Sequence, residues 1–563
     1  MYILGINCAY HESSICLLRD GEIVMALEEE RLTRIKHAKQ ARIDNPHELP
    51  VAALEFCFQH EGIDWKDIDF VGVSLNPANR LLNQYIEEPV RENSWGSRSG
   101  EQLFYEKISS IPSQLQQQGF RGRFHWLDHQ LCHAAAAFYQ APFEEAAILT
   151  LDGIGEFSAS IFARGHGNSQ TVLGEINYPA SLGFLWEKIG LFLGFTEYDA
   201  CKVMGLCAYG DARRYKDRFR KIVSLIGPDS YGMDARCLCF RVDDYGALES
   251  LFGFSRRRPD EELQPHHRDL AAALQEITNE VALHLVRALH RQVPSPNLCL
   301  AGGVALNCVT NRHILEEGPF LHLFIPPAAH DAGTAIGAAL EIWHNILGRE
   351  RERRMENPYL GPAFSEDEMR AALENRGLSH RRVEEVESVT AQFLSEGKIV
   401  GWFQGAMEMG PRALGNRSLL ADPRNAAMRD ILNRKVKHRE DFRPFAPSVL
   451  SEEAGEWFDI ARSVHASDYM LMAYPAKKEQ RSRIPAVVHE DGTSRIQTVK
   501  REMNPRFHRL ISEFRSRTGV PMLLNTSFND GEPIVCTPGD AVNTFMKTGI
   551  DCLVMGNCVS VKP

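Results

Sequence analysis

The sequence lacks the features that mark membrane-spanning, secreted and disulfide-rich proteins. No run of apolar residues approaches the roughly 18 that a membrane-spanning helix needs. The first residues show no basic stretch followed by an apolar one, so a secretory signal is not indicated and we expect a cytoplasmic protein. The thirteen cysteines form no CxxC pair and have no regular spacing, which favours reduced thiols over disulfides. The close pair Cys237 and Cys239 has no second pair beside it, so we assign it to packing.

Positive charge is also in deficit. The chain has 63 Lys and Arg against 74 Asp and Glu, a net charge of -11. Nucleic-acid binding draws most of its affinity from basic side chains that neutralise phosphates. We therefore expect a small-molecule substrate, with no nucleic acid and no membrane as partner. The sequence does not decide between a monomer and a homodimer.

Length and composition indicate a soluble enzyme of two or more domains. The 563 residues exceed the length of one domain, typically about 100–200 residues. A hydrophobic content of 44% and a charged content of 24% are those of a globular chain.

A repeated strand pattern indicates an internal duplication in the first part of the chain. Residues 2–7, 14–18 and 22–27 read as an antiparallel meander, with the turn signal Asp20-Gly21 between the last two. A related strand, turn and strand recur from residue 146, and residues 3–7 align with residues 148–152. Two related lobes facing a cleft are expected, and clefts bind small ligands.

The domain boundary is expected in the charged run 348–354, which precedes Asn357-Pro358. We predict domains at 1–350 and 358–563. The polar stretch 76–100 is expected to be a surface insertion, and the role of residues 76–118 is left open.

Two histidines and two aspartates indicate a metal site. His129 and His133 are four residues apart at the start of an Ala-rich helix, a spacing that stacks both rings on one face. Asp152 ends a second-lobe strand and Asp331 begins a helix, where an acid is also a routine N-cap. Imidazole and carboxylate ligands without thiolate suit Fe, Mn or Zn.

Glycine-rich and basic segments indicate phosphate chemistry. Residues 302–307, GGVALN, follow a predicted strand and could present backbone N–H groups to a nucleotide. The second domain offers basic and polar side chains amid glycines and prolines: Arg412, Arg417, Arg424, Lys435, Lys437, Arg439, Arg443, Asn525, Thr526, Ser527 and Asn529. Guanidinium groups bind phosphate oxygens in pairs, although a solvated basic face is the alternative.

The ordered motifs resemble those of a known family. They are YHESSICLL, EEERLTRIKH, DHQLCHAAAAF, GGVALN, HDAGTAIGAA, GAMEMGPRALGNRS, FRPFAPS and LLNTSFN. From residue 3 to about residue 557, the chain resembles the O-carbamoyltransferases of the nodulation and antibiotic-tailoring group. This resemblance implies an α/β fold, with a two-lobed actin/sugar-kinase-like domain followed by an α/β YrdC-like domain, similar to threonylcarbamoyl-adenylate synthases.

The resemblance also implies two active sites. In the C-terminal domain, Mg-ATP and carbamoyl phosphate would form carbamoyl adenylate, with release of pyrophosphate. The matching phosphate-binding positions are Arg412, Lys437, Arg443, Arg495, Asn525 and Ser527.

In the N-terminal domain, Fe²⁺ or another divalent metal on His129, His133, Asp152 and Asp331 would orient the adenylate for transfer to an alcohol of a small-molecule natural product. Further roles implied there are His11 as the base, Lys36 as a carbamoyl contact, and Asp152, Gly183 and Asn307 as nucleotide contacts.

Alternatives stay open at this point. Lys36 could belong to a surface charge cluster, and His11 could cap backbone groups. Threonylcarbamoylation of tRNA and a non-catalytic nucleotide-binding regulator are the competing functions, and acidic net charge opposes the first. The motifs do not identify the acceptor alcohol or the metal used in vivo.

Overall fold

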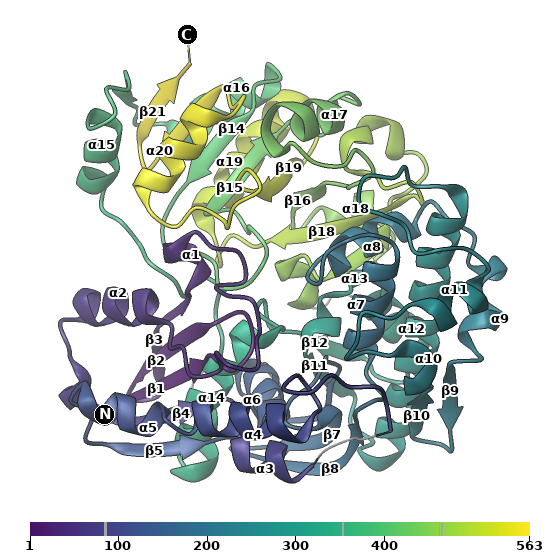
Figure 1. Cartoon of the computed structure of the whole chain (residues 1–563). Helices are drawn as coiled ribbons and strands as arrows, with labels where there is room; N and C mark the ends of the chain where they lie inside the picture. The colour runs from purple at the N-terminus through teal and green to yellow at the C-terminus, as the bar shows by residue number, and fades with distance from the viewer. Residues whose placement is uncertain (84–86, 352–353, 461, 463–464, 563) are drawn as a thin grey trace. The chain divides into compact units, whose positions relative to one another are not determined.

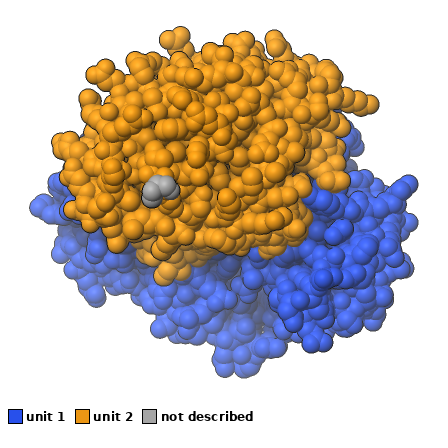
Figure 2. Space-filling model, turned by 90° about the horizontal axis from the view of Figure 1, so that it is seen from above, with its two compact units in different colours: residues 1–29, 37–355 blue, residues 30–36, 356–563 orange. Residues whose placement is uncertain are grey.

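The computed structural model describes residues 1–83, 87–351, 354–460, 462 and 465–562. The chain divides into two compact units, coloured separately in Figure 2. Unit 1 comprises residues 1–29 and 37–355, and unit 2 comprises residues 30–36 and 356–563. Both units combine helices with sheets, which confirms the expected α/β class (Figure 1).

Unit 1 contains two five-stranded sheets with the same connectivity. The first has the order β3-β2-β1-β4-β5 and the second the order β12-β11-β6-β7-β8. In each sheet the first three strands form an antiparallel meander, and the last two run parallel to the first strand. The predicted duplication into two lobes is confirmed. The strands are β1 (Tyr2–Asn7), β2 (Ser14–Arg19), β3 (Glu22–Glu28), β4 (Ile68–Val73), β5 (Arg123–Trp126), β6 (Glu145–Thr150), β7 (Ser158–His166), β8 (Ser169–Asn177), β11 (Asn297–Ala301) and β12 (His322–Phe324).

Two helices, α6 (His129–Gln140) and α14 (Thr334–Glu341), pack together between these sheets. Helix α14 contacts β1, and α6 contacts β6 and β11. Their close approach depends on glycine, because a Cβ on Gly337 would lie 1.8 Å from the carbonyl oxygen of Cys132. This packing brings the start of α6 near the turn that precedes α14.

The other elements of unit 1 surround this core. They are α2 (Val51–Glu61), α3 (Pro77–Leu82), α4 (Arg98–Ile108), α5 (Ile111–Gln117), α7 (Leu182–Phe192), α8 (Ala200–Cys207), α9 (Lys216–Phe219), β9 (Val223–Ile226), β10 (Ser230–Met233), α10 (Ala235–Leu238), α11 (Gly246–Phe252), α12 (Pro265–Gln292) and α13 (Cys308–Glu317). No described helix is long and apolar enough to cross a bilayer. All thirteen cysteines lie in the described ranges, and none of them forms a disulfide.

The surface insertion expected at 76–100 is exposed only in part: Leu82 is 80% exposed, whereas Arg80 is buried. Helices α3 and α4 bury Arg80 at 4% exposure, Glu101 at 3% and Phe104 at 1%. The reason is that the two charges pair with each other, Nε of Arg80 lying 2.8 Å from Oε2 of Glu101. Composition made the stretch look polar, whereas the ion pair allows it to be buried.

Unit 2 is built on a nine-stranded sheet with the order β13-β21-β20-β14-β15-β19-β16-β18-β17. Its strands are β13 (Arg381–Arg382), β14 (Val400–Phe403), β15 (Arg417–Ala421), β16 (Ala446–Leu450), β17 (Met472–Pro475), β18 (Thr493–Val499), β19 (Met522–Ser527), β20 (Cys552–Met555) and β21 (Cys558–Val561). Its α-helices are α1 (Glu30–Thr33), α15 (Glu366–Glu374), α16 (Val386–Ser395), α17 (Met428–Leu432), α18 (Ala454–Trp457), α19 (Pro505–Thr518) and α20 (Pro538–Lys547).

Helix α1 belongs to unit 2 although it lies near the start of the sequence. Leu32 packs against a small core that contains Met407 and Ile534. Arg34 donates hydrogen bonds to the carbonyl oxygens of Ile534 at 2.7 Å and Pro533 at 2.5 Å. The expected first domain, 1–350, is thus interrupted at residues 30–36, and the chain leaves unit 1 for the last time after residue 355.

The charged run expected as a solvated linker is only partly exposed. Arg351 donates to the carbonyl oxygens of Ala141 and Phe143, and Arg354 donates to that of Pro142. Hydrogen bonds thus hold both arginines against unit 1. Residues 352–353 of the run lie outside the described residues.

Candidate functional site

The cluster of unit 1 starts at the first turn of α6. Asp128 caps this helix by accepting the N–H of Leu131 at 3.2 Å. His129 and His133 lie one turn apart, as their spacing predicts, and both side chains are buried. Their ring centroids are 4.7 Å apart and their planes are nearly perpendicular.

Asp152 and Asp331 complete the cluster. Oδ2 of Asp152 lies 3.4 Å from Nε2 of His129 and 3.5 Å from Nε2 of His133. Oδ1 of Asp331 lies 3.7 Å and 3.5 Å from the same two atoms. All four ligand atoms fall within 4.8 Å of one another and all four residues are buried. The structure thus brings together the four side chains that the sequence nominated.

Neighbouring groups orient these side chains. Nδ1 of His129 donates to the carbonyl oxygen of Ser74 at 3.0 Å, which leaves a lone pair on Nε2. The N–H of Gly303 donates to Oδ1 of Asp152 at 2.9 Å, and Oδ2 faces the imidazoles. Within the described residues, Nε2 of His129 and Nε2 of His133 are buried and make no hydrogen bond. Two unpaired imidazole nitrogens beside two carboxylates form a donor set suited to a divalent transition metal.

The charges of the cluster point the same way. Burial alone would lower the pKa of His129, but Asp331 and Asp152 hold it well above its ordinary value. Burial and Asp331 would raise the pKa of Asp152, but His133 and His129 keep it below its usual range. Two buried carboxylates therefore draw protons onto the imidazoles, and a divalent cation could replace those protons at the same place. The residues present fit such an ion.

The alternative role of Asp331 as a helix cap is not supported. The 3₁₀ turn that precedes α14 is η4 (Asp331–Gly333), and its N-cap position is His330. Asp331 is the first residue inside this turn, and its carboxylate faces the two histidines.

His11 lies in the turn between β1 and β2, in unit 1. Its ring lies against Tyr198, with centroids 4.9 Å apart, and its Nδ1 is 3.9 Å from Oε1 of Glu12. Burial would raise the pKa of Asp331, but His129, His133 and, to a smaller degree, His11 hold it well below its usual range. His11 is therefore close enough to the cluster to influence it electrostatically.

Residues 302–307 serve the protein's own structure rather than offering N–H groups to a phosphate. The N–H of Gly303 binds Asp152, and the N–H of Val304 donates to the carbonyl oxygen of Leu151 at 3.0 Å. Asn307 caps α13, because its Oδ1 accepts two backbone N–H groups and its Nδ2 donates to Gln275. The expectation of free backbone donors here is wrong for Gly303 and Val304.

Gly183 lies at the start of α7 and touches the loop that carries Asp152. Its N–H donates to the carbonyl oxygen of Asp152 at 3.2 Å. A Cβ at this position would lie 2.6 Å from the backbone nitrogen of Gly153. Gly183 thus lets α7 approach the metal-ligand loop.

In unit 2, Lys437 and Ser527 come together as expected. Lys437 ends η6 (Asn433–Lys437), a turn of π-helix, and is 5% exposed. Its Nζ donates to Oγ of Ser527 at 3.2 Å and to Oδ1 of Asn529 at 2.7 Å. It also donates to the backbone carbonyl oxygens of both residues.

Positive charges gather around this lysine. Burial, followed by the charges of Arg439 and Arg443, lowers the pKa of Lys437 well below its usual range, with Asp530 opposing and Lys36 adding a smaller effect. Four cationic side chains near one another favour binding of an anion, although Asp530 and Glu440 offset part of their charge. Phosphate, which carries several oxygen acceptors, matches this arrangement.

Arg417 and Arg424 are not phosphate ligands. Arg417 is fully buried, and its guanidinium donates to backbone carbonyl oxygens, including Gln404 at 2.6 Å and Pro362 at 3.1 Å. Arg424 forms a two-pronged pair with Asp422. The sequence alone did not show these contacts, because the spacing of arginines and glycines does not determine which acceptor each guanidinium meets.

The loop that carries Arg412 is shaped by Glu408. Oε1 of this buried carboxylate accepts the N–H groups of Leu414 at 2.8 Å, Asn416 at 2.7 Å and Arg417 at 3.1 Å. Arg412 lies within the loop, and Arg495 lies on β18 in register with Ala473.

Asn525 is held by hydrogen bonds within unit 2, and its role as a phosphate contact stays a prediction. Its Nδ2 donates to Ser448, Gln497 and the carbonyl oxygen of Ala413, whereas its Oδ1 is buried without a hydrogen-bond partner in the described structure. This side chain presents an acceptor rather than a donor to a ligand, so binding phosphate would require the amide to turn over.

Two protein-family models together match most of the chain. The family described as Carbamoyltransferase N-terminus matches residues 2–340, and the family described as Carbamoyltransferase C-terminus matches residues 391–562. The chain belongs to the carbamoyltransferase family. It is similar over 98% of its length to 79% of the nodulation protein NolNO of Sinorhizobium fredii, at 37% identity.

Two further similarities concern parts of this carbamoyltransferase. About half of it (51%) is 35% identical to 53% of the 3'-hydroxymethylcephem-O-carbamoyltransferase of Amycolatopsis lactamdurans. Among solved structures, the activator of the 2-hydroxyisocaproyl-CoA dehydratase from Clostridium difficile, with bound ADPNP, covers 60% of this chain and 93% of its own at 15% identity, with a TM-score of 0.33.

The structure places Lys36 of this carbamoyltransferase in unit 2. Lys36 follows α1, whose Arg31 donates to the carbonyl oxygen of Gly410 at 2.9 Å. Its charge is among those that lower the pKa of Lys437, after burial, Arg439 and Arg443. Lys36 therefore lies in unit 2 rather than in the expected first domain, and its role as a carbamoyl contact stays a prediction.

The sequence analysis did not identify two buried carboxylates of unit 1, Glu12 and Glu156. Glu12 receives a 2.5 Å hydrogen bond from Nδ1 of His37, and it adopts a left-handed backbone with φ of 54°. Glu156 accepts the N–H groups of Asn76 at 2.6 Å and His129 at 3.0 Å. The adjacency of Glu12 to His11 was the only available signal, and none marked Glu156.

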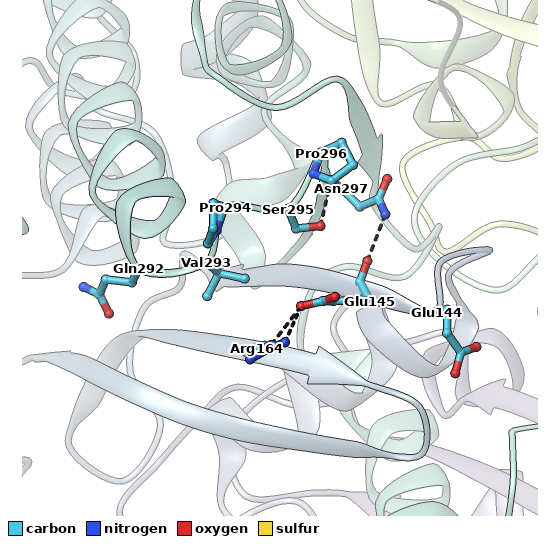
Figure 3. Close-up of a pocket in the computed structure, with 9 residues that line it drawn as sticks. All are labelled: Glu144, Glu145, Arg164, Gln292, Val293, Pro294, Ser295, Pro296 and Asn297. Carbon is cyan, nitrogen blue, oxygen red and sulfur yellow. Dashed lines mark hydrogen bonds and ion pairs between the residues drawn. The ribbon is translucent and has the colours of Figure 1, made fainter.

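A separate pocket of about 600 Å³ lies on unit 1, between the start of β6, the end of β7 and the turn before β11 (Figure 3). Its Arg164 pairs with Glu145 at 2.6 Å. The pocket shares no lining residue with the metal cluster.

Proposed function

We propose that this carbamoyltransferase uses ATP and carbamoyl phosphate to form carbamoyl adenylate in unit 2, and transfers the carbamoyl group to a hydroxyl of a small molecule in unit 1. The observation that carries the proposal is the cationic cluster around Lys437. A buried lysine surrounded by Arg439, Arg443 and Lys36 is costly without an anion, and carbamoyl phosphate supplies one.

The first half-reaction releases two phosphate products. Water attacks the phosphorus of carbamoyl phosphate and breaks its bond to the bridging oxygen, which gives inorganic phosphate and carbamate. A carbamate oxygen then attacks the α-phosphorus of ATP, and the bond to pyrophosphate breaks. Lys437, Arg443, Arg412 and Arg495 neutralise the phosphoryl charge as these groups approach. Ser527 offers its hydroxyl in the same place, since it already contacts Lys437.

The second half-reaction takes place in unit 1. His129, His133, Asp152 and Asp331 would hold a divalent ion, Fe²⁺ or a similar metal, which supplies Lewis-acid polarisation of a carbonyl oxygen. His11 accepts the proton of the acceptor hydroxyl, whose oxygen attacks the carbamoyl carbon as AMP leaves. Gly183 keeps α7 close to the loop of Asp152, where the adenylate would bind.

The acceptor is proposed to be an alcohol of a natural product. The name of the cephem relative includes a hydroxymethyl group and O-carbamoyl transfer, which is the same chemistry. The net charge of -11 opposes a polyanionic acceptor.

The test is to incubate purified protein with ATP and carbamoyl phosphate and to measure pyrophosphate, with carbamoyl adenylate identified by mass spectrometry. Pyrophosphate is expected only when both substrates are present. Lys437→Ala should lose most of this activity, whereas Arg434→Ala, at an exposed position on the same turn, should retain it. A folded, metal-loaded sample that makes no pyrophosphate would refute the proposal.

A further inference from the structure

Buried charged residues of α3 and α4 form a network that reaches the neighbours of His129, His133, Asp152 and Asp331, which are here named the transfer cluster. Arg80 on α3 forms a two-pronged pair with Glu101 on α4, at 2.8 Å and 2.9 Å. Its guanidinium carbon also lies 5.3 Å from the ring centroid of Trp95 and 5.0 Å from that of Phe104. An arginine enclosed by a carboxylate and two rings is held in one orientation.

The remaining N–H groups of Arg80 reach the turn before His11 and the loop after Asp152. Nη1 of Arg80 donates to the hydroxyl of Tyr10 at 2.9 Å and approaches the carbonyl oxygens of Gly155 at 3.5 Å and Glu156 at 3.4 Å. The hydroxyl of Tyr10 donates in turn to the carbonyl oxygen of Gly155 at 2.6 Å. Arg80 therefore joins the residue that precedes His11 to the loop that follows Asp152.

A second link runs from the same segment to His129. Oε1 of Glu156 accepts the N–H of Asn76 at 2.6 Å and the N–H of His129 at 3.0 Å. The start of α3 and the start of α6 thus share one carboxylate. Of the four proposed metal ligands, Asp152 and His129 are both tied to residues that contact this segment.

We infer that Arg80, oriented by Glu101, is a positioning residue that fixes the Asp152–Glu156 loop and the Tyr10–His11 turn for metal binding and carbamoyl transfer. A rigid guanidinium suits this task, because it bonds Glu101 with one edge while its remaining N–H groups reach Tyr10 and the loop carbonyls. The effect on metal binding stands independently of the proposed function, and the effect on transfer rests on it.

The test compares full-length wild type with Arg80→Met, Arg80→Lys and Glu101→Gln after removal of metal. Each apoprotein is titrated with Co²⁺, and the visible absorption of the bound ion reports both affinity and ligand geometry. Arg80→Met should weaken Co²⁺ binding at least tenfold and change the absorption spectrum. Arg80→Lys keeps the charge but loses the fork, and it should weaken binding at least threefold, as should Glu101→Gln.

The control is Arg218→Met. Arg218 also lies over a tyrosine ring, 5.2 Å from the centroid of Tyr215, and donates to backbone carbonyl oxygens of Leu251 and Phe252. It contacts no residue of the metal cluster, so its loss should lower thermal stability and leave Co²⁺ affinity within twofold of wild type. If Arg80→Lys and Glu101→Gln fold and bind Co²⁺ with the affinity and spectrum of wild type, the inference is overturned.

Activity separates this inference from the proposed function. In the Arg80 variants, transfer from carbamoyl adenylate should fall at least tenfold in kcat while pyrophosphate formation stays within twofold of wild type. Equal loss of both activities would contradict a role at the transfer cluster. A wild type that makes no pyrophosphate would defeat the proposed function, yet the Co²⁺ titrations would still decide the role of Arg80.

Discussion

Removal of one imidazole from the cluster gives the sharpest test of the metal site. In His129→Ala, Asp152 and Asp331 lose a partner that lies 3.4 Å and 3.7 Å from their oxygens, and the carbonyl of Ser74 loses its donor. Breaking a buried charged pair by removing one member costs about 3–5 kcal/mol. The metal-free variant should therefore unfold at a lower denaturant concentration than wild type.

The affinity of the site for a metal ion should fall as well. Changes to residues that only orient a ligand cost about 10–100-fold in affinity, so loss of a ligand itself should exceed about 100-fold. The assay is metal content after dialysis, measured beside two activities: pyrophosphate formation and transfer from carbamoyl adenylate. We expect little bound metal and no transfer, with pyrophosphate formation intact, because the four proposed ligands belong to unit 1 and the proposed phosphate site to unit 2.

His322→Ala is the matched control. His322 is an exposed histidine of unit 1 on β12, so its loss should change neither metal content nor either activity. Two results would contradict the assignment of metal binding and transfer to unit 1 and of adenylate formation to unit 2. In one, His129→Ala binds metal as tightly as wild type; in the other, it loses pyrophosphate formation as completely as transfer.

Three other predictions follow from the structure. The depressed pKa of Lys437 should rise when a phosphate binds, so binding should take up a proton and should weaken as pH rises above the pKa of Lys437 in the free enzyme. Calorimetry of carbamoyl phosphate binding in two buffers of different ionisation enthalpy measures this proton uptake. Lys437→Ala should abolish it. Arg417→Met should lower the melting temperature strongly, since several buried carbonyl groups lose their donor at about 1–3 kcal/mol each; an unchanged melting temperature would contradict the structural role. Gly183→Ala should weaken metal binding and transfer, because its Cβ would displace the Gly153 backbone; wild-type Co²⁺ affinity would count against this.

Local patterns in the sequence determined a large part of the fold. The alternation of apolar strands and turns predicted the first meander and the first two strands of the second, because a strand buried between layers must be apolar whatever its partner. The four-residue spacing of His129 and His133 required one helical face, since helix geometry depends only on the backbone. The family motifs were readable for the same reason: each is a short, continuous segment.

Only the tertiary structure decided which distant segments meet. Nothing local marks Leu32 and Arg34 as part of unit 2, because their partners Ile534 and Pro533 are some 500 residues away. Side-chain contacts likewise separated Arg417, enclosed by carbonyl oxygens, from the arginines proposed to meet substrate.

The buried pair of Arg80 and Glu101 illustrates the same limit. Each residue alone reads as solvated, and burial becomes favourable only when the fold places the opposite charge within hydrogen-bond distance. The sequence by itself thus determined the elements, the duplication and the ligand types. The tertiary structure decided which charges are buried together, because pairing energies depend on distances that no local pattern encodes.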